Sequence, residues 1–314
     1  MLLYNRMGRP QLLARLNAET FQRKTLSFYR YVLIDNPHEL RDKLYVAWDQ
    51  LQCNGRIYLA QEGINAQMTI PEHHLEQFIA HLNSIPQFSE MPLKYALEDN
   101  GESFLKLKIK VRPKIVADGL NDTTFDVTTV GKHLDPVEFH ELAGKDDVIV
   151  VDMRNKYESE VGRFKNAFCP DASTFREELN IVVKQLAEQK NKKILLYCTG
   201  GVRCEKASAW LTHHGFTDVN QLYGGIIAYV SEIQQQGLES RFIGKNFVFD
   251  ERLGERVTSH VIAKCHTCGQ PCDTHINCAF DPCHKLFIQC QSCQEAYKGC
   301  CCIECKSMLR DKSW

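Results

Sequence analysis

The sequence predicts an α/β protein with three parts: an N-terminal α+β sandwich, a central domain around a parallel sheet, and a cysteine-rich, metal-binding tail. The first part alternates strand-like and helix-like patterns, and the second contains apolar strand runs separated by helical segments. Eleven of the 15 cysteines then fall between Cys265 and Cys305. We expect an extension over 1–25, the sandwich over 26–115, a linker over 116–130, the central domain over 131–244 and the cysteine-rich region over 245–314.

Size and composition are those of an ordinary globular protein. The 314 residues suffice for two or three domains, 44% of them are hydrophobic, and the formal net charge is -1. This balance gives no global signal for nucleic acid or membrane. The chain has no apolar run near the roughly 20 residues that span a bilayer, and its first residues do not resemble a secretory signal. We therefore expect a cytoplasmic protein with no membrane partner, whose cysteines bind metal or perform thiol chemistry rather than form disulfides.

The N-terminal part is expected to contain four strands and two helices in the order βαββαβ. Helical patterns cover 37–51 and 71–83, and Pro71 suits the first position of the second helix. This order is typical of a ferredoxin-like sandwich. The strand-like segments are 27–34, 56–60, 64–70 and 104–115.

The central part begins near Asp135 and Pro136, which suit the N-cap and first position of a helix. Two continuous apolar runs, Val148–Val151 and Lys193–Tyr197, are typical of parallel strands that are buried on both faces. Helical patterns separate these runs. We therefore expect an α/β sheet whose ligands bind at the carboxyl ends of the strands.

Cys198 follows the second of these strands and opens the six-residue loop Cys-Thr-Gly-Gly-Val-Arg. A helical stretch follows, so the loop lies at the positive end of a helix and can direct backbone N–H groups at an anion. Two glycines permit the backbone geometry of such a cradle. If the loop stabilises the thiolate by roughly 2.7 kcal/mol, the pKa of the cysteine falls by about two units from about 8.5, and the thiolate is dominant at neutral pH. We predict that Cys198 is the catalytic thiol, in an anion cradle formed by Thr199, Gly200, Gly201, Val202 and Arg203.

The length of the loop distinguishes two enzyme classes that use a Cys-loop-Arg cradle. Tyrosine phosphatases place five residues between Cys and Arg, because their loop wraps a phosphate, whereas four residues intervene here. The shorter loop fits a single sulfur atom and favours sulfur transfer. Arg203 then acts as a fixed cation or as a bidentate donor to an anionic substrate.

Three residues near the loop have two interpretations each. Cys204 is either a resolving thiol or a small buried residue that packs against the sheet. Asp152 and Arg154 follow the first apolar strand, and they either reach the thiol loop or form an ion pair that braces neighbouring loops. We expect Glu158 to be structural.

Longer motifs around these residues resemble a known family. Asp152–Glu158 and Gly162–Ala167 are similar to the first motif of rhodanese domains, although Arg163 stands where many members have His. Cys198–Ala207 is similar, more narrowly, to the bacterial tRNA uridine hydroxylase family, whose members carry a rhodanese domain behind a ferredoxin-like domain. Further segments that resemble this family are Gly55–Ala66, Leu222–Ile226 and Phe247–Arg252.

The resemblance implies oxygen-dependent hydroxylation of the wobble uridine of tRNA at carbon 5, with Cys198 as a persulfide-type active thiol. The residues by themselves predict only sulfur transfer. The sequence has no flavin or nicotinamide fingerprint and no clear two-His-one-carboxylate iron site, so it does not reveal the oxidising cofactor. Our leading hypothesis is a tRNA-modifying oxidoreductase that uses molecular oxygen. The alternatives are a persulfide-forming sulfurtransferase, with thiosulfate or a carrier protein as sulfur donor, and a non-catalytic RNA-binding module, against which the intact thiol loop argues.

Cations occupy every second position between residues 106 and 114, and apolar residues fill the positions between them. On a strand this pattern places the charges on one face, about 6.6 Å apart, which roughly matches the phosphate spacing of a nucleic-acid strand. The stripe is either an RNA-binding surface or an exposed strand that lysines protect from aggregation. The family resemblance favours RNA. Strand tyrosines such as Tyr29, Tyr31 and Tyr58 are more often core residues than stacking faces. The candidate RNA-binding residues are Lys106, Lys108, Lys110, Arg112 and Lys114.

Three C-x2-C pairs in the tail predict metal binding, because two such pairs place four thiolates around one tetrahedral ion. The metal would fold a segment that is too small to build its own core. Eight of the 11 cysteines fill two sites, and their spacing does not say which pairs combine. Zinc is favoured over an iron–sulfur cluster, which would supply redox chemistry. The candidate ligands are Cys265, Cys268, Cys278, Cys283, Cys290, Cys293, Cys302 and Cys305.

Overall fold

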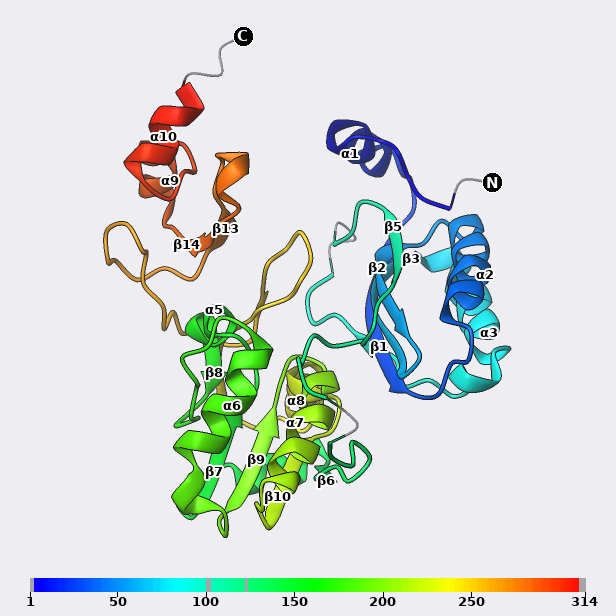
Figure 1. Cartoon of the computed structure of the whole chain (residues 1–314). Coiled ribbons are helices and arrows are strands. Elements are labelled where there is room, and N and C mark those ends of the chain that lie inside the picture. Colours follow the sequence, from blue (N-terminus) through cyan, green and yellow to red (C-terminus); the bar gives the residue numbers. More distant parts are fainter. Residues whose placement is uncertain (1–2, 100–102, 122–123, 311–314) are drawn as a thin grey trace.

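The computed structural model describes residues 3–99, 103–121 and 124–310 (Figure 1). It confirms the α/β architecture: an N-terminal α+β part, a central parallel sheet and a cysteine-rich region at the C-terminal end. Within the described residues, no helix is both long enough and apolar enough to cross a membrane.

The N-terminal sheet has five strands in the order β4-β1-β3-β2-β5. Helices α2 and α3 cover one of its faces, where Trp48 and Phe78 pack on Phe28 and Ile57. Because side chains alternate along a strand, the polar residues between these core positions all lie on the other face. The elements are α1 (Arg9–Asn17), β1 (Arg23–Tyr31), α2 (Pro37–Gln50), β2 (Asn54–Ala60), β3 (Gly63–Pro71), α3 (Leu75–Asn83), β4 (Lys94–Tyr95) and β5 (Leu107–Val111).

Two expectations for this sheet were wrong in detail. The strand expected over 104–115 is only β5, which pairs parallel with β2 at one edge. At the opposite edge, β4 pairs with β1 and completes the ferredoxin-like strand order. The sequence did not reveal β4, because its two residues are too few to show an alternating pattern. The helix expected over 71–83 begins at Leu75, because Pro71 ends β3 and the 3-10 turn Glu72–His74 follows it.

The central sheet has four strands in the order β6-β10-β9-β7, all parallel. Its two faces are covered by different helices. Leu196 packs on the side of α6 and α7, and Leu195 on the side of α4 and α8. The elements are β6 (Lys132–Leu134), α4 (Pro136–Leu142), β7 (Val148–Asp152), α5 (Lys156–Val161), α6 (Phe175–Gln185), β9 (Lys193–Tyr197), α7 (Val202–His213), β10 (Asp218–Leu222) and α8 (Gly225–Gln235).

The C-terminal region rests on helix α5 of the central domain (Figure 1). Val161 and Tyr157 of α5 pack with Phe247, Ala263 and Ile288 of this region. A small sheet of β8, β11 and β12 joins the two parts. The elements are β8 (Gly162–Phe164), β11 (Phe242–Asn246), β12 (Glu255–Arg256), β13 (His275–Asn277), β14 (Leu286–Ile288), α9 (Gln291–Tyr297) and α10 (Ile303–Arg310).

Candidate active site

Cys198 lies directly after β9, and helix α7 begins four residues later. The Cys198 side chain is buried, and its Sγ accepts a hydrogen bond of 3.2 Å from the backbone N–H of Gly201. Burial raises the pKa of the thiol. A hydrogen bond from the Cys204 thiol, the charge of Arg203 and further backbone N–H groups outweigh burial and lower the pKa of Cys198 to about 6. Cys198 is therefore mainly a thiolate at neutral pH, as its position at a helix N-terminus predicts.

Arg203 is held beneath the loop by Glu158. Its guanidinium donates two hydrogen bonds to the Glu158 carboxylate, of 2.6 Å and 2.9 Å, and a third of 3.3 Å to Thr199 Oγ1. Both partners are almost fully buried. The bidentate face of Arg203 is thus occupied by Glu158, so Arg203 acts on Cys198 as a fixed cation.

Cys204 lies in the first turn of α7 and is fully buried. Burial, together with its hydrogen bond to Cys198, raises the pKa of the Cys204 thiol well above its usual range. Cys204 therefore remains protonated and donates to the Cys198 thiolate. In this arrangement Cys204 stabilises the Cys198 thiolate.

The two loop glycines, Gly200 and Gly201, differ in whether a side chain would fit in their place. Gly201 has φ +99°, and a Cβ there would lie 2.8 Å from the hydroxyl of Tyr29, whereas a Cβ at Gly200 would meet no atom within 4 Å. A third glycine, Gly225 at the start of α8, has φ +68°, and a Cβ there would lie 2.6 Å from the backbone oxygens of Cys198 and Thr199. Gly201 and Gly225 are therefore the positions at which the loop geometry excludes a side chain.

The N-terminal domain contacts the thiol loop directly, which the sequence did not suggest. Tyr29 donates a hydrogen bond of 3.0 Å to Glu205, and Tyr31 donates one of 3.3 Å to the backbone oxygen of Val202. Lys206, the next residue of α7, forms an ion pair of 2.8 Å with Glu62. These tyrosines belong to the interface between the two domains. Their pairing depends on contacts between residues more than 170 positions apart, for which a single sequence carries no local signal.

A cavity of about 360 Å³ lies between the thiol loop and the polar face of the N-terminal sheet. Cys198 and Arg203 line one wall, and strand residues of the N-terminal domain line the opposite wall. This volume is within the range of small-ligand sites. The polar residues on the opposite wall include Ser27, Tyr29, Arg56, Tyr58, Asn65, Gln67 and Lys94.

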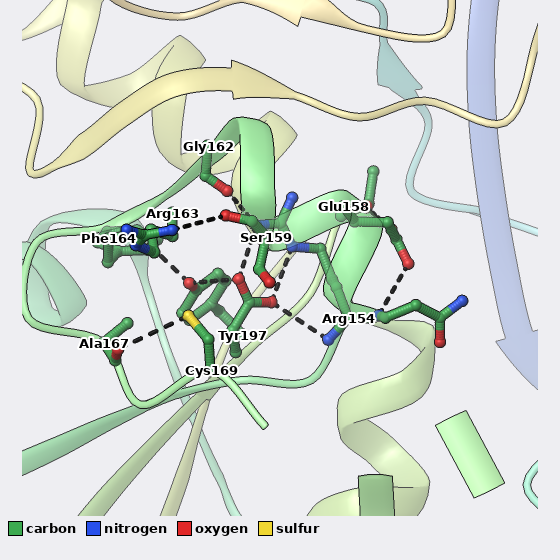
Figure 2. A network of polar contacts seen from close by, with 12 residues as sticks. Arg154, Glu158, Ser159, Gly162, Arg163, Phe164, Ala167, Cys169 and Tyr197 are labelled. Atoms are coloured by element: carbon green, nitrogen blue, oxygen red, sulfur yellow. Dashed lines mark hydrogen bonds and ion pairs between the residues drawn. The ribbon is translucent and has the colours of Figure 1, made fainter. Parts of the chain in front are cut away.

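Asp152 and Arg154 form a fully buried ion pair, and neither residue lines the cavity. Figure 2 shows the network of polar contacts around Arg154 and Tyr197. Arg154 donates two hydrogen bonds to Asp152, of 2.8 Å and 2.7 Å, and one of 2.6 Å to the backbone oxygen of Gly162. Tyr197 donates a hydrogen bond of 2.6 Å to the same carboxylate. The geometry matches the bracing interpretation, in which the pair joins the ends of β7 and β9 to β8.

Strand register aligns the cationic stripe of β5 with the wall of the cavity. Lys108 pairs with Arg56, Arg56 with Gln67, Gln67 with Ser27, and Ser27 with Lys94, so these five residues form one row across the sheet. Directly opposed residues lie on the same face. The row therefore leads from the β5 edge to the cavity. Arg56 is a member that the sequence interpretation missed.

Not every cation of the stripe between residues 106 and 114 is available to bind RNA. Leu107 and Ile109 are buried in the core, as the alternating pattern predicts. Lys114, however, lies beyond the end of β5 and donates hydrogen bonds of 2.8 Å to Asp118 and to the backbone oxygen of Leu120. Its ammonium is engaged by the linker.

The cysteine-rich region brings eight thiols together in two groups of four. In each group the sulfur atoms lie within 4.8 Å of one another. Within the groups, Sγ–Sγ distances of 3.7 Å join Cys268 to Cys290 and Cys283 to Cys301. A tetrahedral ion with metal–sulfur bonds of about 2.3 Å requires sulfur atoms about 3.8 Å apart, so the residues fit such an ion. The groups are Cys265, Cys268, Cys290 and Cys293, and Cys278, Cys283, Cys301 and Cys305.

The second group corrects one expected ligand. Cys301 takes the place that the sequence interpretation gave to Cys302. Cys302 begins the C-x2-C pair with Cys305, but its sulfur accepts a hydrogen bond from the Cys305 N–H and lies outside the group of four. Adjacent cysteines cannot be distinguished by spacing.

Comparisons with known proteins give matches to three family descriptions. Residues 23–115 match the UPF0176 acylphosphatase-like domain, residues 135–232 the rhodanese-like domain, and residues 243–306 the rhodanase C-terminal family. A relative from Leptospira interrogans serogroup Icterohaemorrhagiae serovar Lai (strain 56601), named tRNA uridine(34) hydroxylase, is 57% identical over 98% of this chain and 84% of its own length.

Two further relatives bear the same name. The protein from Hamiltonella defensa subsp. Acyrthosiphon pisum (strain 5AT) is 52% identical over 98% of this chain and 87% of its own length. The protein from Enterobacter sp. (strain 638) is 51% identical over 96% of this chain and 86% of its own length. At this identity and coverage, the chain belongs to the tRNA uridine(34) hydroxylase family.

Proposed function

We propose that this protein hydroxylates uridine 34 of tRNA at carbon 5 in the cytoplasm, with Cys198 as the reactive group. The observation that carries the proposal is the Cys198 thiolate in the wall of a ligand-sized cavity. The names of its relatives supply the substrate. The opposite wall, with its polar and aromatic side chains, offers the partners that a nucleobase needs.

The proposed chemistry uses the thiolate as a nucleophile. Cys198 Sγ adds to C6 of uracil, and the electron pair of the C5–C6 double bond moves toward C5 and O4. C5 then bonds to one atom of molecular oxygen. A thiol reductant gives up two electrons, which release the second oxygen atom as water. Loss of the C5 proton and departure of the Cys198 thiolate restore the double bond and leave 5-hydroxyuridine.

The cationic row provides the proposed path for the RNA. Lys108 and Arg56 line a second groove that continues from β5, and Arg56 also lines the Cys198 cavity. Phosphates bound along Lys106, Lys108, Lys110 and Arg112 would bring an unpaired base to the cavity beside Arg56. Sequence-specific RNA recognition favours such flipped-out, unpaired bases.

The two cysteine groups are proposed to hold zinc in a structural role. Four thiolates with no open position are typical of structural zinc sites. The first group packs on α5, which carries Glu158, so a bound ion would hold in place the helix that positions Arg203. The ion would supply no chemistry to Cys198, because the groups are not part of the cavity.

A second candidate function is persulfide-forming sulfur transfer. The low pKa of Cys198 and the short loop favour it, since both stabilise an anionic sulfur. Transfer of sulfur from thiosulfate to cyanide by the purified protein would support this alternative.

Nucleoside mass spectrometry of tRNA from cells that lack the protein tests the proposal. We expect 5-hydroxyuridine and its derivatives at position 34 to disappear in the deletion strain and to return with the wild-type gene but not with Cys198→Ser. An unchanged nucleoside content in the deletion strain refutes the hydroxylase function. Restoration by Cys198→Ser refutes the role of the thiol.

A further inference from the structure

Lys94 is a lysine of the N-terminal domain that lines the Cys198 cavity. It belongs to the two-residue edge strand β4 and pairs with Ser27 of β1. It is the last residue of the polar row that begins at Lys108. A second cavity of about 730 Å³ lies on its other side, so Lys94 stands at the junction of the two.

The ammonium of Lys94 is held by an aromatic face and not by a carboxylate. Its Nζ lies 4.5 Å from the centre of the Tyr29 ring, and its aliphatic chain passes Gly224, where a Cβ would lie 3.6 Å from Lys94 Cε. Tyr29 is fixed in turn by its hydrogen bond to Glu205. Among the described residues, no ion pair or hydrogen bond to Lys94 Nζ is formed. Lys94 is half-buried. A partly desolvated ammonium that forms no direct ion pair or hydrogen bond is costly, which indicates a group kept for a ligand.

The groups around Lys94 set its protonation. Burial lowers the pKa of Lys94 to about 8, and the charges of Cys198 and Glu205 act in the opposite direction. Tyr29 remains neutral, because burial raises its pKa far above the usual range. Between about pH 6 and pH 8, the Cys198 thiolate and the Lys94 ammonium are therefore present together. An acid with a pKa near the working pH is suited to proton transfer.

We propose that Lys94 is a second catalytic residue, which donates a proton to the oxygen of the substrate ring on which negative charge develops. This inference rests on the proposed function. When Cys198 Sγ bonds to C6, the displaced electron pair reaches O4, and Lys94 Nζ gives O4 a proton and becomes a neutral amine. When C5 bonds to oxygen, the C4 carbonyl forms again and the proton returns to Lys94. The residue ends each cycle as the ammonium it began as.

Two substitutions at Lys94 test the proposal in the full-length protein with unmodified tRNA. We expect Lys94→Met to lower kcat about 100-fold or more, the usual range for loss of general acid catalysis, with little change in KM for tRNA. In the wild type, kcat/KM should fall above about pH 8, where Lys94 loses its proton. Lys94→Arg should lose this alkaline limb, because a guanidinium does not deprotonate.

Lys43→Met is the matched control, since Lys43 is an exposed residue of α2 that pairs with Glu39. A Lys94→Met enzyme with kcat within about threefold of this control, and with the alkaline limb unchanged, overturns the proposal.

Alkylation of Cys198 by iodoacetamide measures the effect of Lys94 on the pKa of Cys198, and this readout does not require that the protein hydroxylates tRNA. Loss of the neighbouring charge should raise the pKa of Cys198 in Lys94→Met, and Lys94→Arg should leave it close to the wild-type value. If the wild type forms no 5-hydroxyuridine, the proposed function fails, whatever Lys94 does. If Cys198 has the same pKa in the wild type and in Lys94→Met, the Lys94 charge does not act at the sulfur. That result would overturn the position of Lys94 beside Cys198, on which the proposal depends.

Discussion

Glu158 and Arg203 form a doubly hydrogen-bonded ion pair beneath the thiol loop, with N–O distances of 2.6 Å and 2.9 Å. The Glu158 side chain is fully buried and that of Arg203 is 10% exposed. The pair joins helix α5 to the first turn of α7. It therefore connects the helix on which the cysteine-rich region rests with the residue whose charge stabilises the Cys198 thiolate.

Glu158→Gln should destabilise the protein by about 3 to 5 kcal/mol, because it leaves the Arg203 charge buried without its partner. Urea unfolding followed by circular dichroism measures this change. Glu188→Gln, which alters an exposed residue of a surface turn, is the matched control and should have almost no effect. Equal unfolding midpoints for the two variants would show that the pair does not hold the loop.

Alkylation of Cys198 should follow an ionisation near pH 6. Only the thiolate reacts, so the rate should rise with pH up to this value and then level off. Peptide mass spectrometry measures the reaction at Cys198 separately from the other cysteines. Cys169 is an internal control, since burial raises its pKa to about 12 and it should stay unreactive at neutral pH. A Cys198 midpoint near that of an ordinary thiol would contradict the anion cradle.

Gly201→Ala should cost about 1 to 3 kcal/mol of stability, because it combines a left-handed φ with a clash against the Tyr29 hydroxyl. Gly200→Ala should be tolerated, since its Cβ meets open space. Adding Tyr29→Phe to Gly201→Ala removes the clashing oxygen and should recover part of the loss. Thermal melting of the three variants checks the order, and a Gly200→Ala protein as unstable as Gly201→Ala would show that the loop conformation is different.

Cys301→Ser should remove one of two bound metal ions, and Cys302→Ser should retain both, because only Cys301 belongs to the second group of four thiols. Elemental analysis of the purified variants gives the metal content and tells zinc from iron. Retention of both ions in Cys301→Ser, with loss of one in Cys302→Ser, would reverse the assignment.

Lys108→Ala should weaken tRNA binding and reduce the slope of log affinity against log salt by about one, as expected for loss of one phosphate contact. Lys114→Ala is the matched control, because the Lys114 ammonium is engaged by Asp118 and Leu120 and should not contribute to the slope. Filter binding at several salt concentrations measures both. Equal slopes for Lys108→Ala and the wild type would exclude β5 from the RNA path.

The thiol loop could be predicted from the sequence because its determinants are local. A buried strand, a nucleophile, glycines and a helix N-terminus follow one another within a few residues of Cys198. Three other features could not be predicted in the same way. Tyr29 contacts Glu205 from another domain, Lys94 belongs to a two-residue strand, and the choice between Cys301 and Cys302 depends on how the tail folds.

The interpretation of the N-terminal sheet succeeded for its core and failed at its edges. The alternation of cations and apolar residues along β5 identified the buried residues Leu107 and Ile109. Strand pairing depends on backbone hydrogen bonds, which leave little trace in side-chain patterns, so the two-residue edge strand β4 was missed and the strand near Ile109 was expected to be longer than it is. The same limitation hid Arg56, whose importance comes from its register with Lys108.

The most direct test of the central claim is the reaction itself. Purified protein should convert uridine 34 of unmodified tRNA to 5-hydroxyuridine in the presence of molecular oxygen and a thiol reductant, with one oxygen atom from isotopically labelled oxygen gas in the product. Cys198→Ser, folded as judged by circular dichroism, should form none. Hydroxylation by Cys198→Ser at the wild-type rate, or label-free product from the wild type, would contradict the role of the Cys198 thiolate in an oxygen-dependent reaction.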